Sequence, residues 1–259
     1  MALLALPFGL AIGLSLGLVG GGGSILAVPV LVYVLGEPVK AATTESLLIV
    51  GATALLGSLD HAKGGRVRWR VAIAFGLPGA VGSLGGTALN RVVGSRSLLL
   101  AFAVLLLVAA AAMVRGRGEP GRPEIPPHGA GLWLRIVPAG LATGVLTGFF
   151  GVGGGFAIVP ALTLLLALPL RAAVGTSLVC IGITSAAALA AHLATATPAE
   201  GRIDWTVAAV FTAAAVGGAV LGSRVGRRVP VHRLAQGFAG LVVAVSVFLV
   251  TKNLMALLG

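Results

Sequence analysis

The sequence predicts an all-α polytopic membrane protein made of two inverted-topology repeats of about five hydrophobic segments each. Three observations lead to this prediction: an apolar composition, an internal duplication, and a charge pattern that reverses between the two copies. The chain is 58% hydrophobic and 10% charged, with a mean hydropathy of +1.08. Because a soluble domain carries about 25% charged residues, this composition indicates a membrane protein.

Several of the apolar segments are long enough to cross a bilayer, and the second one of each repeat is much shorter. In the first repeat, 1–114, they cover 2–19, 25–35, 43–59, 71–93 and 97–114; in the second, 132–259, they cover 132–150, 156–168, 172–194, 205–223 and 234–251. A membrane-spanning helix needs roughly 18 or more apolar residues. Residues 115–131, rich in Gly, Pro and polar residues, are the predicted cytoplasmic linker. Repeated ten-residue alternation, the pattern of a β-barrel, is absent.

The duplication shows in residues that match at a fixed spacing. Pro29 and Pro160 are 131 residues apart, and the same spacing joins His61 to His192. Beyond a short insertion in the second copy, Trp69 matches Trp205. Chance pairing of apolar residues does not place Pro, His and Trp in register together, so the two halves descend from one unit.

The basic loops predict that the second copy is inverted. Lys and Arg concentrate in cytoplasmic loops of membrane proteins, and an odd number of segments per repeat reverses the second copy. This model puts the following basic residues inside: Lys63, Arg66, Arg68, Arg70, Arg115, Arg117, Arg122, Arg135, Arg171, Arg224, Arg227, Arg228 and Arg233. It puts Lys40, Arg91, Arg96, Arg202 and Lys252 outside. Inverted repeats are the usual frame of secondary transporters, which hold substrate near the midplane with discontinuous helices.

Glycine clusters at 20–23 and 151–155 interrupt apolar segments in both repeats. Gly has the poorest helix propensity after Pro, so each cluster breaks a helix, and protein or a polar cavity must satisfy the freed backbone groups. Each break is predicted to form a re-entrant-like hairpin whose short second arm, containing Pro29 or Pro160, stops inside the membrane. The unpaired N–H groups at its start suit an anion. The other interpretation of the clusters is a tight hairpin turn packed in protein.

A small-polar motif opens the third segment of each repeat, and its hydroxyls complete the predicted anion site. The predicted substrate-binding residues are Gly20, Gly22, Gly23, Ser24, Thr44 and Ser46 in the first repeat, and Gly151, Gly153, Gly154, Gly155, Thr176 and Ser177 in the second. For the Thr and Ser residues, ordinary N-capping is the competing interpretation.

Three titratable residues are candidates for carrying a coupling proton. Glu45 occupies the position that Thr176 holds in the other copy, and an acid within a membrane span is a functional candidate. The alternative is that Glu45 sits at the interface in the first helical turn. His61 and His192 occupy matching helix ends, where a structural role competes with proton relay. Cys180, the single cysteine, is interpreted as a packing residue, and it excludes an internal disulfide.

Signatures of other functions are missing. Neither glycine cluster is followed by Lys-Ser or Lys-Thr, and Ile25 and Phe156 stand where a dinucleotide-binding motif needs Gly. We therefore expect no enzyme activity, no metal and no cofactor. The net charge of +11 is explained by the basic loops, so no nucleic-acid partner is expected. The first charged side chain is Glu37, so no cleavable signal peptide is expected.

The motifs resemble the TauE/SafE family of membrane permeases over essentially the whole chain. The resemblance rests on the glycine cluster 151–155, on Pro160 and on the motif 173–177, with a weaker copy in the first repeat. It implies transport of a small sulfur-containing anion, such as sulfite, sulfoacetate or another organosulfonate, across the bacterial inner membrane, with protons as the coupling ion. Glu45 departs from the symmetric pattern. The alternatives are a passive anion channel of the same fold and a membrane accessory subunit without a ligand; the oligomeric state is left open.

Overall fold

A computed structural model describes residues 2–115, 130–196 and 203–226, together with positions 240, 243, 244, 247 and 251. The regular elements in these ranges are all helical. The first repeat contains α1 (Ala2–Val19), η1 (Gly20–Leu26), α2 (Ala27–Tyr33), α3 (Val39–Lys63), α4 (Trp69–Val92) and α5 (Ser95–Arg115). The second contains α6 (Ala130–Phe150), α7 (Gly155–Pro160), η2 (Ala161–Leu165), α8 (Leu170–Thr195) and α9 (Trp205–Gly226).

These helices confirm the predicted all-α membrane protein. Six helical stretches in the described ranges are long and apolar enough to cross a membrane. The short second segments are confirmed as well, since α2 covers 7 residues and α7 covers 6. The linker at 116–129 and nearly all of the tenth segment, 234–251, lie outside the described residues.

The third segment of each repeat begins earlier than predicted. Pro38 and Pro169 occupy the N-cap positions of α3 and α8, and neither cap makes a side-chain hydrogen bond. Pro suits the start of a helix because it lacks the N–H that would be unpaired there. The small-polar motifs therefore lie inside α3 and α8, so the N-capping interpretation of their Thr and Ser residues is wrong.

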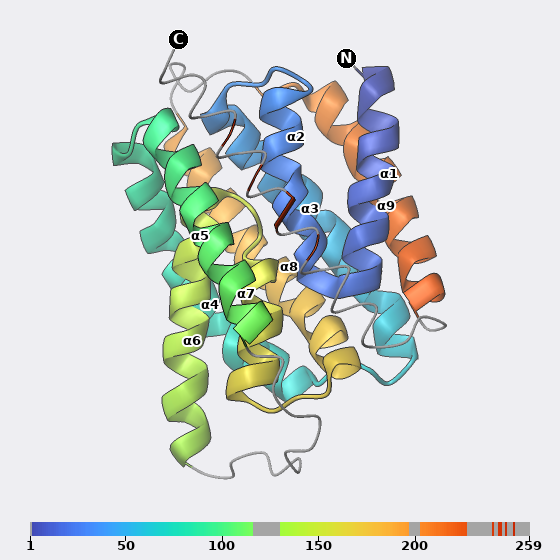
Figure 1. Ribbon diagram of the computed structural model, residues 1–259, viewed down its shortest axis with the longest axis vertical. Coiled ribbons are helices and arrows are strands. Elements are labelled where there is room, and N and C mark those ends of the chain that lie inside the picture. Colours follow the sequence, from blue (N-terminus) through green and yellow to red (C-terminus); the bar gives the residue numbers. More distant parts are fainter. Residues whose placement is uncertain are drawn as a thin grey trace.

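The helices pair across the two repeats. Helix α1 packs along α9, α4 along α6, and α3 along α8; Figure 1 shows α1 beside α9 on one side of the molecule and α4 beside α6 on the other. Small residues permit this approach, because a Cβ added to Gly13 would lie 1.8 Å from the Ala215 oxygen. A Cβ added to the matching Gly144 would lie 1.9 Å from the oxygen of Gly79, the counterpart of Ala215.

The first helices of the two repeats, α1 and α6, point in opposite directions. In Figure 1, α1 descends from the N-terminus whereas α6 begins at the bottom of the view and rises. Matching residues exchange their contacts between the repeats, as a two-fold relation between them requires. The orientation of this relation to the bilayer plane stays a prediction.

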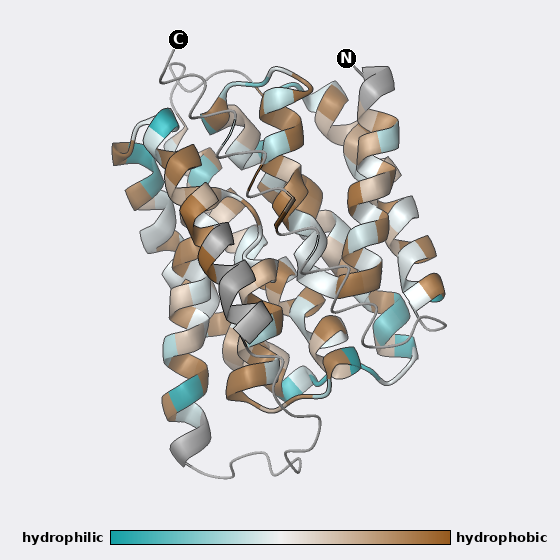
Figure 2. Ribbon diagram, viewed as in Figure 1, coloured by the Kyte–Doolittle hydropathy of each residue, from teal (hydrophilic) through white to brown (hydrophobic). Residues whose placement is uncertain are grey.

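Polar side chains lie inside the helix bundle, and large apolar ones face outward. Leu77, Val81 and Leu134 are more than half exposed, whereas Glu45 and Thr147 are fully buried. Figure 2 shows hydrophobic residues over the outward surfaces of the long helices and hydrophilic ones gathered toward the two ends. An apolar exterior of this kind suits contact with lipid.

Basic residues lie at both ends of the helix bundle. Arg68 and Arg70 line one hollow with the loop 166–169, and Arg66 and Arg171 line a second one nearby. At the other end, the Lys40 ammonium donates to the backbone oxygens of Asn90 and Val93. We call the first of these the basic end; the predicted orientation makes it cytoplasmic.

Candidate functional site

The two glycine breaks have different local geometries, although both are buried. The first is the 3-10 helix η1, which Gly20 enters with φ of +73°. The second is an open turn in which Gly151, Gly153 and Gly154 have φ between +63° and +70° before α7 begins. Only Gly adopts such angles without strain. The Ser24 hydroxyl donates to the Gly21 oxygen over 2.7 Å, so this predicted site residue stabilises its own turn.

The breaks touch each other at the middle of the molecule. A Cβ added to Gly21 would lie 2.1 Å from the Gly155 Cα, and a Cβ added to Gly155 would lie 2.2 Å from the Gly21 Cα. Figure 1 shows η1 and α7 between the outer helix pairs. The tight-turn interpretation and the site interpretation are thus both compatible with burial in protein, and exposure of the breaks to bulk solvent is excluded.

Each break lies against the small-polar motif of the opposite repeat. A Cβ added to Gly20 would lie 3.0 Å from the Ser177 hydroxyl and 3.1 Å from the Val174 Cα. A Cβ added to Gly151 would lie 2.6 Å from the Cβ and the oxygen of Thr43, the counterpart of Val174. The structure therefore brings the predicted glycines and the motif helices together crosswise. Gly22 and Gly23 are buried in the same region.

Most of the predicted hydroxyls already have partners. Ser177 donates to the Val174 oxygen over 2.8 Å, and Thr44 lies 3.3 Å from both the Lys40 oxygen and His192 Nδ1. Thr176 accepts a hydrogen bond from the Arg68 N–H over 3.0 Å. Ser46 is different: its hydroxyl is fully buried and has no hydrogen-bond partner among the described residues.

Glu45 lies in the second turn of α3, one turn later than expected, and its side chain is fully buried. Its Oε1 accepts a hydrogen bond from the Asp204 N–H over 3.0 Å, while Oε2 has no hydrogen-bond partner among the described residues. Asp204 is the counterpart of Arg68, and Glu45 is the counterpart of Thr176. Glu45 and Thr176 therefore play the same part: each accepts a hydrogen bond from the loop before the next long helix of the other repeat.

His61 and His192 are both buried, each near the end of the helix that leads into a glycine break. His192 Nε2 lies 3.0 Å from the Gly148 oxygen, so Nε2 carries a proton and Nδ1 faces the Thr44 hydroxyl. His61 lies beside Gly175, where an added Cβ would be 3.2 Å from the His61 Cβ. His61 also lines a cavity of about 20 Å³ with Arg66, which is room for about one water molecule.

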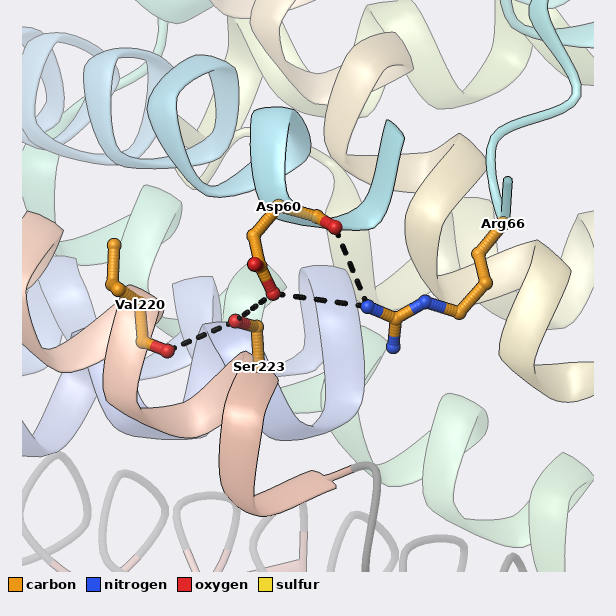
Figure 3. Close-up of polar contacts among 4 residues, drawn as sticks. All are labelled: Asp60, Arg66, Val220 and Ser223. Atoms are coloured by element: carbon orange, nitrogen blue, oxygen red, sulfur yellow. Dashed lines mark hydrogen bonds and ion pairs between the residues drawn. The ribbon is translucent and has the colours of Figure 1, made fainter. Parts of the chain in front are cut away.

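A polar cluster at the basic end was not predicted from the sequence. Arg66 Nη2 lies 3.7 Å from Asp60 Oδ2, to which the Ser223 hydroxyl donates over 2.6 Å (Figure 3). Ser223 also donates to the Val220 oxygen over 2.9 Å. The cluster joins the end of α3 to α9. Its sequence signal is weak, because the counterpart of Asp60 in the second repeat is Ala191.

Glu37 lies outside the long helices at the end opposite the basic one. Partial burial raises the pKa of the Glu37 carboxyl, and the negative charge of Asp204 raises it further. Asp204 itself accepts hydrogen bonds from the N–H groups of Thr206 and Val207 and so caps α9. Among the described residues, no group of three or more His, Cys, Asp and Glu side chains is placed to hold a metal ion.

An open hollow of about 570 Å³ lies at the basic end between the start of α4 and the η2–α8 loop. Its lining includes Arg68, Arg70 and Ala167. Guanidinium groups at such a mouth raise the local concentration of anions.

Comparison with known proteins points to membrane transport. The family model described as sulfite exporter TauE/SafE matches residues 5–249. A probable membrane transporter protein of Xylella fastidiosa (strain 9a5c) is 34% identical over 249 residues, which cover 93% of this chain and 92% of the relative. The probable membrane transporter protein YunE of Bacillus subtilis is 27% identical over 244 residues, covering 85% of this chain and 86% of the relative. No solved structure matches the chain.

Proposed function

The chain belongs to the TauE/SafE family of membrane transporters, and from this premise we propose that it is a secondary transporter of a small sulfur-containing anion. The substrate is sulfite, sulfoacetate or another organosulfonate, and it crosses the inner membrane together with protons. The chain is a multi-pass membrane protein by its six apolar helices. In this proposal it has no enzymatic activity, and its partners are the anion, protons and the surrounding lipid.

The observation that best supports this proposal is the crosswise contact of each glycine break with the other repeat. Gly20 lies against Ser177, and Gly151 lies against Thr43. Broken helices inside a membrane are tolerated only where protein covers the freed backbone groups or where they line a polar cavity, because those groups have no water to bind. Here the breaks supply N–H donors and the facing helices supply hydroxyls, which are the ligands that an oxyanion needs.

The relation between the repeats supports alternating access. If the repeats are inverted, one conformation opens the breaks toward one side of the membrane, and exchange of the repeats' conformations opens them toward the other. The breaks pack directly against each other at Gly21 and Gly155. In the proposed cycle this is the closed arrangement, and the basic hollow at Arg68 and Arg70 is the cytoplasmic mouth.

Glu45 is the proposed carrier of the coupling proton. One carboxyl oxygen accepts the Asp204 N–H while the other has no partner in the described part of the chain. A buried carboxyl with one oxygen available binds a proton without losing its structural bond. His192 contacts Thr44, next to Glu45, and is proposed to assist this transfer at the same end of α3, whereas His61 lies beside Arg66 at the basic end and is proposed to assist it there.

Replacement of Gly154 by Leu tests the proposed site. Gly154 has φ of +63°, and an added Cβ would lie 2.1 Å from the Thr147 hydroxyl, so Leu distorts the second break. The control is Gly85→Leu, since Gly85 is exposed and an added Cβ there meets nothing within 4 Å. In proteoliposomes loaded with sulfite, we expect flux to fall at least tenfold in the Gly154 variant and to persist in the control.

Two outcomes contradict the proposal. Wild-type flux in a folded Gly154→Leu variant shows that the break does not bind the anion. Wild-type protein that equilibrates sulfite but never accumulates it under an imposed proton gradient is a passive channel. Both outcomes are read against intact folding, measured by monodisperse elution and an unchanged melting temperature.

A further inference from the structure

Three buried hydroxyls on the central helix pair differ from the other hydroxyls of the bundle. Ser46 and Thr53 of α3 and Ser185 of α8 are at most 1% exposed, yet none has a hydrogen-bond partner among the described residues. In membrane helices Ser and Thr usually donate to the carbonyl three or four residues earlier. Thr87, Thr147 and Thr184 do so in this protein.

One of the three hydroxyls, Ser185, lies next to Gly153 of the second break, and the other two flank Val50, which also contacts this glycine. Ser46, Val50 and Thr53 are spaced four and then three residues apart, which places them in one stripe along α3. A Cβ added to Gly153 would lie 2.6 Å from the Val50 Cγ1 and 3.2 Å from the Ser185 hydroxyl. Val50, in the middle of the α3 stripe, and the Ser185 hydroxyl of α8 therefore both lie next to Gly153.

The charges of the buried side chains bear on which ligand could bind beside Gly153. Among the side chains that the structure describes as buried, none belongs to Lys or Arg. The nearest buried acid in the sequence, Glu45, lies on a different face of α3, since its Oε1 accepts the N–H of Asp204. The hydroxyls therefore surround a place without a full positive charge, where donors are neutral dipoles.

We propose that Ser46, Thr53 and Ser185 are the hydroxyls that bind the substrate anion beside Gly153, and that they select a monoanion over a dianion. This inference rests on the proposed transport function and narrows its substrate class: it favours monoanions over sulfoacetate, which carries two negative charges at neutral pH. Hydroxyl and backbone N–H donors match the oxygens of a sulfonate group, R–SO₃⁻. Without a buried cation, a second negative charge is not compensated in a low-dielectric site, so sulfate is disfavoured.

A bound anion would also give these hydroxyls the hydrogen-bond partner that they lack among the described residues. A buried hydroxyl without a partner destabilises the fold, so its replacement by an apolar group of the same shape is neutral or stabilising in the free protein. The same replacement removes a hydrogen bond to a charged ligand. Free-state stability and ligand affinity are therefore expected to change in opposite directions, which a purely structural hydroxyl does not produce.

The test compares Thr53→Val with Thr184→Val in the purified full-length protein. Thr184 is the counterpart of Thr53 in the second repeat, equally buried, but its hydroxyl donates to the Cys180 oxygen over 3.0 Å. Binding of methanesulfonate is measured from the ligand-dependent rise in melting temperature. We expect Thr53→Val and Ser185→Ala each to weaken binding about tenfold without lowering the ligand-free melting temperature. Thr184→Val is expected to change binding less than twofold.

Sulfate, tested in the same way, is expected to bind at least tenfold more weakly than methanesulfonate to the wild type. Equal binding of the two anions, or unchanged methanesulfonate binding in both Thr53→Val and Ser185→Ala, overturns this inference while leaving the transport function standing. A wild type that is stabilised by none of methanesulfonate, sulfite and sulfoacetate, and that transports none of them, overturns the proposed function itself and this inference with it.

Discussion

The two repeats make the same backbone contacts with different side-chain chemistry. In the first repeat the carboxylate of Glu45 accepts the Asp204 N–H, and in the second the hydroxyl of Thr176 accepts the Arg68 N–H. Both repeats therefore have a hydrogen-bond acceptor at this position, and it binds the loop before α9 in one case and the loop before α4 in the other. The difference is that Glu45 can also bind a proton. The duplicated scaffold thus accepts either side chain at this position because the shared hydrogen bond survives, and at this position only the first copy can titrate.

The largest effects are expected where the two repeats are most alike. Gly13→Leu and Gly144→Leu each place a side chain where the oxygen of the partner helix lies less than 2 Å from the added Cβ. Each is expected to destabilise the protein by about 3 kcal/mol or more, beyond the usual range for overpacking. The yield of monodisperse protein after detergent extraction measures this loss. If the protein tolerates Leu at one of these sites but not at the other, the two helix pairs are not equivalent.

Intermediate effects are expected at the pair of acceptors. Glu45→Ala and Thr176→Val each leave a backbone N–H without its partner and are expected to lower stability by about 1–2 kcal/mol. Glu45→Gln keeps an acceptor oxygen but cannot bind the proton. We expect it to melt near the wild-type temperature, to retain anion flux down a gradient, and to lose accumulation driven by a proton gradient.

The same flux assay applied to Thr176→Val sharpens this comparison. Accumulation in that variant is expected to respond to the proton gradient as in the wild type, since its carboxyl at position 45 is intact. Loss of proton-driven accumulation in Thr176→Val, or its persistence in Glu45→Gln, contradicts the assignment of coupling to the first repeat.

The smallest effects are expected at the turns that follow the short helices. Gly36 has φ of +73°, and its counterpart Ala167 has φ of 51°, the one non-Gly residue with positive φ in the described part of the chain. A left-handed conformation costs an L-residue about 1 kcal/mol relative to Gly. Ala167→Gly is therefore expected to raise the melting temperature slightly and Gly36→Ala to lower it. A shift of the same sign in both variants contradicts the matched geometry.

The sequence predicts the fold well because its signals are local and repeated. Apolar length gives the long helices, the glycine clusters give the breaks, and the 131-residue spacing of Pro29 and Pro160 shows the duplication. The starts of α3 and α8 are missed because Pro38 and Pro169 begin each helix before its apolar run. These differences, four residues at α3 and two at α8, are what made the motif hydroxyls resemble N-caps.

The site is predicted less completely because partners from distant segments cannot be read from residue types. The sequence marks Thr44, Ser46, Thr176 and Ser177 alike, but only the structure separates Ser46, which lacks a partner in the described part of the chain, from the other three. Thr53 and Ser185 are missed because isolated hydroxyls in apolar helices are common. The hydrogen-bond partner of Glu45, the Asp204 N–H, lies 159 residues away in the sequence.

The inverted relation of the repeats is the claim on which the crosswise site and alternating access depend, and cysteine labelling tests it directly. Cys180 is the single cysteine, so Cys180→Ser gives a background in which Gly36→Cys and Ala167→Cys report separately. Both positions are exposed and follow the matching short helices. The account predicts that a membrane-impermeant maleimide labels position 36 only from outside the cell and position 167 only in inside-out vesicles. Labelling of both positions from the same side contradicts it.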